Sequence, residues 1–171
     1  MGGEGFKNSQ GRIGEMRSFA AAGVNIRQVV NFSEKEIRFL KYMRVGRLAT
    51  MEGEAIHLVP ICPVFDGTIF FMATHTKTRK VRNLRKNNNA TLLIDQYSED
   101  WMRHVAVMMT GTVDIIGRGS EFDRAKALLD AKFQQYNELF PIREGESVIL
   151  CFKPAKAVTW DYVVGELNEP H

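Results

Sequence analysis

Apolar positions along this chain occur in short runs separated by Gly, Pro, Asn and Asp, a pattern typical of β-strands. The runs predict six strands, at 45–50, 55–65, 68–72, 90–95, 105–116 and 146–160. Pro60 and Pro63 interrupt the second strand. Because proline cannot donate a ladder hydrogen bond, we expect this strand at a sheet edge or a bulge. Pro154 predicts a break in the last strand.

Three other stretches have the spacing of a helix. Residues 33–36 read as a capping box and start a short amphipathic helix. A strongly basic helix follows at 77–86, and apolar residues at helical spacing predict one longer helix over 121–136. Residues 1–30 are Gly-rich and weakly patterned, so we interpret them as an N-terminal extension to a single domain at 31–171.

Most of the predicted strands follow one another through short turns, such as the hairpin turn at Asp66 and Gly67. About six short strands in one small domain are best closed as a barrel, which removes exposed edges. The sequence therefore predicts a mainly β protein in which the helices plug or flank a barrel.

The 171 residues are 44% hydrophobic and 25% charged, as in an ordinary soluble globular domain. No apolar run is long enough to cross a membrane, and residues 1–5 lack the layout of a secretory signal, so we expect a cytoplasmic protein. Cys62 and Cys151 lie in apolar segments and are interpreted as buried thiols. The four histidines have no metal-like spacing, and no metal site is predicted.

Residues 73–84 carry the most distinctive chemistry. Thr76 and Thr78 follow a predicted strand and can cap the basic helix, whose free amides then point out of the turn beside Arg79, Lys80 and Arg82. Hydroxyls, cations and backbone donors at a helix start are typical of an anion site, most often for phosphate. The same charges fit a solvated helix face or a nucleic-acid surface, although a net charge of +3 favours the last least.

Several segments together resemble the pyridoxamine 5′-phosphate oxidase-like, FMN-binding split barrels. They are residues 44–50, 57–61, 73–84, 97–101 and Trp160, and the similarity covers about residues 33–162. The resemblance implies a six-stranded split β-barrel with two to three flanking helices. It also implies a homodimer with two cofactor sites at the interface.

The resemblance further implies a set of cofactor-binding residues. These are Val59, Pro60, Ile61, Ala73, Thr74, Thr78, Arg79, Lys80, Trp101 and Trp160. In that family the phosphate would be bound at 78–80 and the ribityl chain or ring would lie close to Thr74. The backbone at 59–61 would follow the isoalloxazine edge. Trp160 would approach the flavin from the last strand, and Trp101 would serve the partner's site.

The chain departs from the pattern of the family's vitamin oxidases at two places. The family's vitamin oxidases end in an Arg-Leu-His-Asp-Arg tail that binds substrate, and this chain has no such motif after Trp160. Ala106 stands where those oxidases carry a glutamine that contacts the flavin. Because the tail is missing, we expect a member of the class that is not a pyridoxamine phosphate oxidase. The departure at Ala106 concerns the contacts with the flavin ring and leaves the expected phosphate site unchanged.

The leading hypothesis is an FMN-dependent oxidoreductase acting on a small-molecule substrate, with no nucleic-acid or membrane partner. An 8-hydroxy-5-deazaflavin is the alternative cofactor, because the basic helix could accept its charged tail. A flavin- or haem-binding module without turnover is the alternative function. No catalytic side chain is assigned. His57 lies beside the strand expected along the ring and could hydrogen-bond a substrate, but we interpret it as a structural histidine with satisfied nitrogens.

Overall fold

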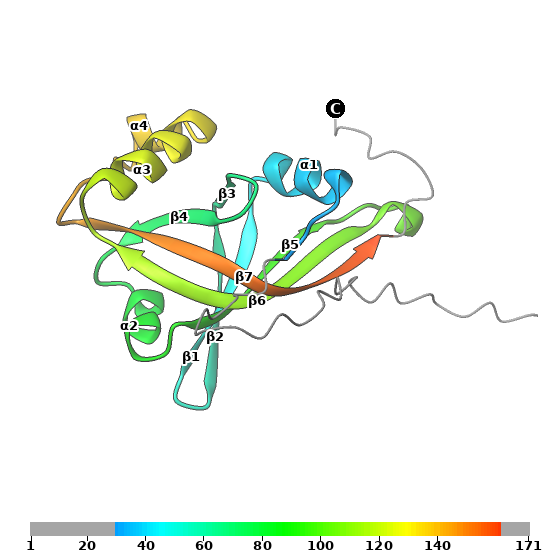
Figure 1. The fold of residues 1–171 in the computed structure, drawn as a ribbon, viewed down its shortest axis with the longest axis horizontal. Helices are drawn as coiled ribbons and strands as arrows, with labels where there is room; N and C mark the ends of the chain where they lie inside the picture. Colours follow the sequence, from blue (N-terminus) through cyan, green and yellow to red (C-terminus); the bar gives the residue numbers. More distant parts are fainter. Residues whose placement is uncertain (1–29, 162–171) are drawn as a thin grey trace, which may run out of the picture.

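The structure is a computed structural model, and it describes residues 30–161. Within that range an antiparallel sheet of seven strands has the order β2-β1-β5-β6-β7-β4-β3 (Figure 1). The strands are β1 (Gly46–Glu52), β2 (Ala55–Ile61), β3 (Val64–Phe65), β4 (Phe70–His75), β5 (Asn89–Gln96), β6 (Val105–Ile116) and β7 (Ser147–Asp161). The helices are α1 (Glu34–Tyr42), α2 (Arg79–Lys86), the 3₁₀ turn η1 (Trp101–Arg103), α3 (Ser120–Lys132) and α4 (Gln135–Glu138).

The mainly β architecture is confirmed, and the strand count differs by one. The predicted strand at 55–65 is divided into β2 and β3 by Cys62 and Pro63, which belong to neither strand. The expected edge position is correct, since β2 is the outermost strand on its side and accommodates Pro60 opposite Arg47. The predicted N-terminal extension lies outside the described residues except for its last residue.

The sheet encloses one apolar core and carries a second on its outside. In β4, Phe70 and Met72 face the first core, whereas Phe71 faces the second core under α3. In β7, Leu150 and Ile149 divide in the same way. Both strands read as continuous apolar runs in the sequence because each has two buried faces.

The helix predicted over 121–136 is wrong in one respect, because it is two helices. Phe133 ends α3 with extended backbone (φ −128°, ψ 93°), and its N–H makes the last helical bond to Leu129. The Phe133 side chain is then buried in the second core beside Tyr136. Burial of this ring in the core accompanies the break in the helix.

Pro154 produces a bulge in β7 without ending it. The register with β6 passes from Thr110 opposite Lys156 to Gly111 opposite Pro154, so Ala155 is the extra residue. At this point the two backbones approach so closely that a Cβ on Gly111 would lie 2.1 Å from the Lys153 carbonyl oxygen.

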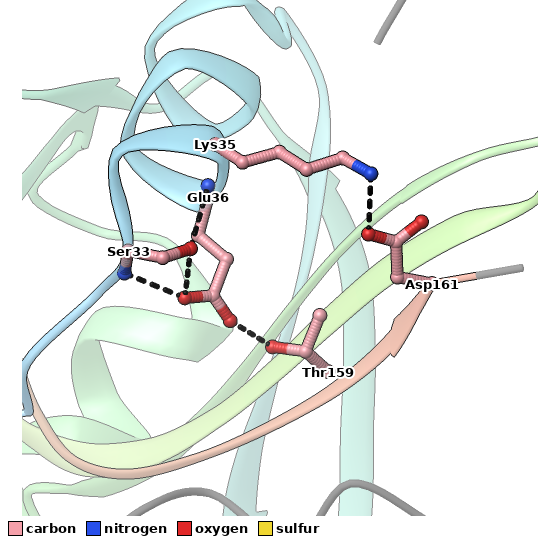
Figure 2. Close-up of polar contacts among 5 residues, drawn as sticks. All are labelled: Ser33, Lys35, Glu36, Thr159 and Asp161. Atoms are coloured by element: carbon pink, nitrogen blue, oxygen red, sulfur yellow. Dashed lines mark hydrogen bonds and ion pairs between the residues drawn. The ribbon is translucent and has the colours of Figure 1, made fainter. Parts of the chain in front are cut away.

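The predicted capping box is confirmed, and it also binds α1 to the end of β7 (Figure 2). Glu36 accepts hydrogen bonds from the backbone N–H of Ser33 at 2.7 Å and from the Thr159 hydroxyl at 2.5 Å. One residue away, the Lys35 ammonium forms an ion pair with Asp161 at 2.8 Å. The start of α1 therefore holds the last residues of β7 on both sides of Trp160.

Lys132 joins α3 to two loops, and its titration gives a first prediction. Its ammonium donates to the carbonyls of Met43 (2.6 Å) and Pro63 (3.1 Å). Burial, aided by the Arg44 charge and opposed by Cys62, lowers the pKa of Lys132 to about 8 from 10.5. Between these values the unfolded chain binds more protons, so this residue's contribution to stability rises with pH.

We expect the unfolding free energy of the wild type to rise relative to that of Lys132→Met as the pH is raised from 8 to 10.5. Chemical denaturation at several pH values measures it. The methionine keeps the apolar stem and removes the titrating group, so parallel pH profiles for the two proteins would show that the pKa is not shifted.

None of the helices in residues 30–161 has the length and apolar character that crossing a membrane requires. Over the same range no three His, Cys, Asp or Glu side chains come together as metal ligands.

Candidate functional site

The site predicted at 73–80 forms where β4 ends and α2 begins. The backbone N–H of Thr76 donates to Glu146 at 2.9 Å, which fastens the turn to the residue before β7. The N–H of Thr78 donates back to His75 at 3.2 Å, and Thr78 has the extended backbone of an N-cap residue. Short local bonds therefore define the approach to α2.

The structure corrects the expected capping of α2. Thr78 occupies the N-cap position, but its hydroxyl donates to the His75 carbonyl at 3.1 Å and does not accept from the helix. No side chain in the described part of the chain is seen to cap the helix, and its first turn contains no acidic residue. The first-turn amides and the positive end of the helix dipole are thus left for an external anion.

Lys80 lies half-buried at the same point. Its ammonium donates to the Thr74 hydroxyl at 3.0 Å, and the Thr74 and Thr78 hydroxyl oxygens are 3.4 Å apart. It forms no ion pair with any residue in the described part of the chain. Burial lowers the pKa of Lys80, as expected for a desolvated cation without a counter-charge. This arrangement fits a phosphate group.

Arg79 points elsewhere. Its guanidinium is bound to the Glu52 carboxylate at the end of β1, with Nε at 2.6 Å and Nη2 at 2.5 Å from Oε2. Sequence analysis missed this acid, which lies 27 residues before Arg79 in the chain. No local pattern marks Glu52, because the contact depends on how α2 packs against the β1–β2 hairpin.

The hairpin brings β2 to the same region. Asn83 of α2 is buried and donates to the Thr50 hydroxyl at 3.2 Å, and Thr50 pairs with His57 in register. Val59, Pro60 and Ile61 continue this strand, with Val59 half-buried and Pro60 exposed. As β2 is an edge strand, one side of its backbone has no neighbouring strand among the residues that the structure describes.

His57 departs from its interpretation as a satisfied structural histidine. Its Nδ1 atom is buried and has no hydrogen-bond partner among the residues that the structure describes. A buried nitrogen without a partner is costly, and it marks His57 as a polar group available to a ligand beside α2. The place of His57 beside the strand expected along the ring had already made a contact with a substrate the alternative interpretation.

The two tryptophans are not brought to this site. Trp160 lies opposite Ala106 near the end of β7, whereas Val148 of the same strand lies opposite Thr74. Val148 and Trp160 are twelve positions apart in β7, which corresponds to a path of about 40 Å along the strand. Trp101 lies in η1 beyond β5 and β6, with 74% of its surface exposed, and α2 is at the opposite end of the molecule (Figure 1).

A hollow of about 400 Å³ lies on the outer face of the sheet, the face of β1, β5, β6 and the end of β7 that points away from the first core. Its lining includes Met51, Ile56, Thr91, Thr110 and Lys156. Ile56 is 71% exposed, and Leu58 beside it on β2 is 59% exposed. Apolar side chains of this exposure on neighbouring positions are typical of an interaction surface.

The curled antiparallel sheet, its enclosed core and its flanking helices define the chain as a split β-barrel. It belongs to the family described as pyridoxamine 5′-phosphate oxidase, which matches residues 32–161. No curated protein gave a significant match.

Several solved structures share the fold at low sequence identity. A conserved hypothetical protein from Mycobacterium tuberculosis is 19% identical with a TM-score of 0.64, covering 84% of this chain and 92% of its own. The haem storage protein from Vibrio cholerae is 16% identical with a TM-score of 0.62, covering 75% and 93%. An FAD-binding protein from Mesorhizobium loti is 14% identical with a TM-score of 0.63, covering 75% and 94%.

Proposed function

We propose that this protein binds FMN with its phosphate at the start of α2 and acts as an oxidoreductase on a small molecule. The observation that carries the proposal is Lys80, a half-buried cation that has hydroxyl neighbours and no acidic partner in residues 30–161. The FAD-binding protein of the same fold supports a flavin as the cofactor. Because the haem storage protein has this fold too, the experiment below also looks for haem.

Two parts of the fold would bind the cofactor, the start of α2 at the phosphate and β2 at the ring. Lys80, Thr74 and Thr78 would bind the phosphate together with the first amides of α2, and Ala73 would lie beside the ribityl chain. Val59, Pro60 and Ile61 would place the backbone of β2 along the ring. When bound, the flavin supplies hydride or electron transfer, and the protein orients it and limits access of water.

A homodimer would bring the remaining predicted residues to the site. Trp160 and Trp101 lie at the far end of the molecule from Lys80 (Figure 1), so a second copy would have to supply them. The outer face, with its hollow and the exposed side chains of Ile56 and Leu58, is the surface that we propose for this contact. Each site would then combine α2 of one copy with the end of β7 of its partner.

A deazaflavin is the second candidate cofactor, favoured by one observation. Arg82, Arg85 and Lys86 are exposed on α2, and none forms an ion pair with another described residue. A chain of negative charges beyond the ribityl phosphate could follow these cations. FMN, which ends at the phosphate, has no group to meet them.

We expect the freshly purified protein to absorb visible light as a flavoprotein and to release FMN on heating, as identified by mass spectrometry. Light scattering of the same sample is expected to give twice the chain mass. Released deazaflavin would move the protein to the second candidate, and released haem would favour the binding module. A protein that takes up none of the added cofactors, or that binds FMN but never turns over with a reduced nicotinamide or another donor, would contradict the oxidoreductase.

A further inference from the structure

The two cations at the start of α2 stand in different environments. The Lys80 side chain extends toward β4, where the Thr74 hydroxyl is the one hydrogen-bond partner of its ammonium among the described residues. Arg79 leans toward the β1–β2 hairpin, where the Glu52 carboxylate neutralises it. Within residues 30–161, a phosphorylated ligand at this helix start therefore meets one cation without a counter-charge and one that is already paired.

The Arg79–Glu52 pair can be exchanged at low cost. Both side chains are nearly half exposed, at 48% and 42%, and an ion pair in contact with water is weak. Its contacts end on one carboxylate oxygen, Oε2, whereas the strongest Arg–carboxylate pairs use both oxygens. A phosphate carrying more charge can compete for the same guanidinium.

Release of Glu52 would leave α2 in place. The buried hydrogen bond from Asn83 to the Thr50 hydroxyl also joins the helix to β1, and it involves neither charge. Val81 and Leu84 bury the underside of α2 in the first core. The ion pair is therefore separable from the packing that holds the helix.

We propose that Glu52 sets the affinity of the phosphate site: its carboxylate holds Arg79 until a phosphorylated ligand competes for that guanidinium. This inference rests on the proposed function, since it requires a phosphate at the start of α2. The bound ligand must displace or share Glu52, and it also experiences the negative charge of that carboxylate. Glu52 thus lowers affinity for an anion through Arg79, and where the ligand displaces Glu52 the β1–β2 hairpin (Figure 1) loses one contact with α2.

The test measures FMN binding to the full-length protein and its variants by flavin fluorescence at low salt. Glu52→Gln is expected to bind FMN about three- to tenfold more tightly than the wild type, and the gain is expected to shrink as salt is added. In an Arg79→Gln background the same substitution is expected to give less than a twofold gain, because the cation through which Glu52 acts is absent and only the direct effect of the carboxylate charge remains.

Glu54 provides the matched control. It lies in the same turn, is exposed, and forms no hydrogen bond or ion pair within the described range. Glu54→Gln makes the same change in charge and is expected to alter affinity less than twofold, roughly the size of a screened surface effect. Equal gains in the two variants would show that Glu52 acts only through its negative charge and not through Arg79. Weaker FMN binding by Glu52→Gln would show that Glu52 positions Arg79 for the ligand. Either result overturns the proposal.

The wild type separates this inference from the function on which it rests. If the wild type binds neither FMN nor inorganic phosphate, the phosphate site itself is wrong and both proposals fall. If it binds FMN and Glu52→Gln binds it equally, only the role of Glu52 falls. Thermal unfolding of each variant checks that the fold is retained.

Discussion

Replacing Lys80 with alanine is expected to weaken FMN binding by about 1.5–3 kcal/mol, or about 10- to 150-fold. The ammonium is the desolvated cation of the site, and its loss removes a charge-assisted hydrogen bond that no other described side chain can replace from the same position. Isothermal titration with FMN measures the change directly.

Lys86 is the matched control for this prediction. It lies at the last position of the same helix, is exposed, and has the same charge. Lys86→Ala is expected to change FMN affinity by less than about 0.5 kcal/mol, as for other exposed charges. Equal losses in the two variants would indicate a diffuse effect of the basic helix, and unchanged binding by Lys80→Ala would remove Lys80 from the site.

The second large effect is expected at Gly111. A Cβ at this position would lie 2.1 Å from the carbonyl oxygen of Lys153 and 2.9 Å from the Cα of Pro154, and both are backbone atoms that cannot turn aside. Gly111→Ala must therefore separate β6 from β7 at the bulge. We expect a loss of at least about 3 kcal/mol in the free energy of unfolding, measured by chemical denaturation.

Gly117→Ala is the control, because Gly117 directly follows β6 and tests whether a Gly-to-Ala change near these strands is destabilising in itself. A Cβ there would meet nothing nearer than Val148 Cγ1 at 4.0 Å. Its stability is expected to stay within about 1 kcal/mol of the wild type. A Gly111→Ala protein as stable as this control would show that the bulge relaxes without loss.

Local patterns predicted much of the fold. The capping box at Ser33 and Glu36 needs only four neighbouring residues, and the strand at 105–116 is bounded by its own apolar pattern, so both could be placed from the sequence. The two errors occur where tertiary packing overrides the local pattern. Phe133 leaves its helix and is buried in the second core, and Cys62 and Pro63 separate β2 from a two-residue strand that pairs with β4.

The candidate site follows the same division. The location of Thr78 and Lys80 together at the start of α2 could be predicted, because turn, hydroxyl and cation are adjacent in the chain; their role in binding a cofactor stays a prediction. The Glu52 partner of Arg79 and the unpartnered Nδ1 of His57 were not, since both depend on how α2 and the hairpin come together. The separation of Trp160 from Lys80 likewise follows from the course of β7, which no local spacing encodes.

The contacts between α1 and the end of β7 have a consequence for the order of the chain. Lys35 and Asp161 touch at 2.8 Å, although they lie near the beginning and end of the described residues. A short linker could therefore join these two points, and new termini could be opened in the exposed turn at Gly53, whose added Cβ would touch nothing. We expect such a circular permutant to keep the strand pairing of the described sheet except at the cut turn.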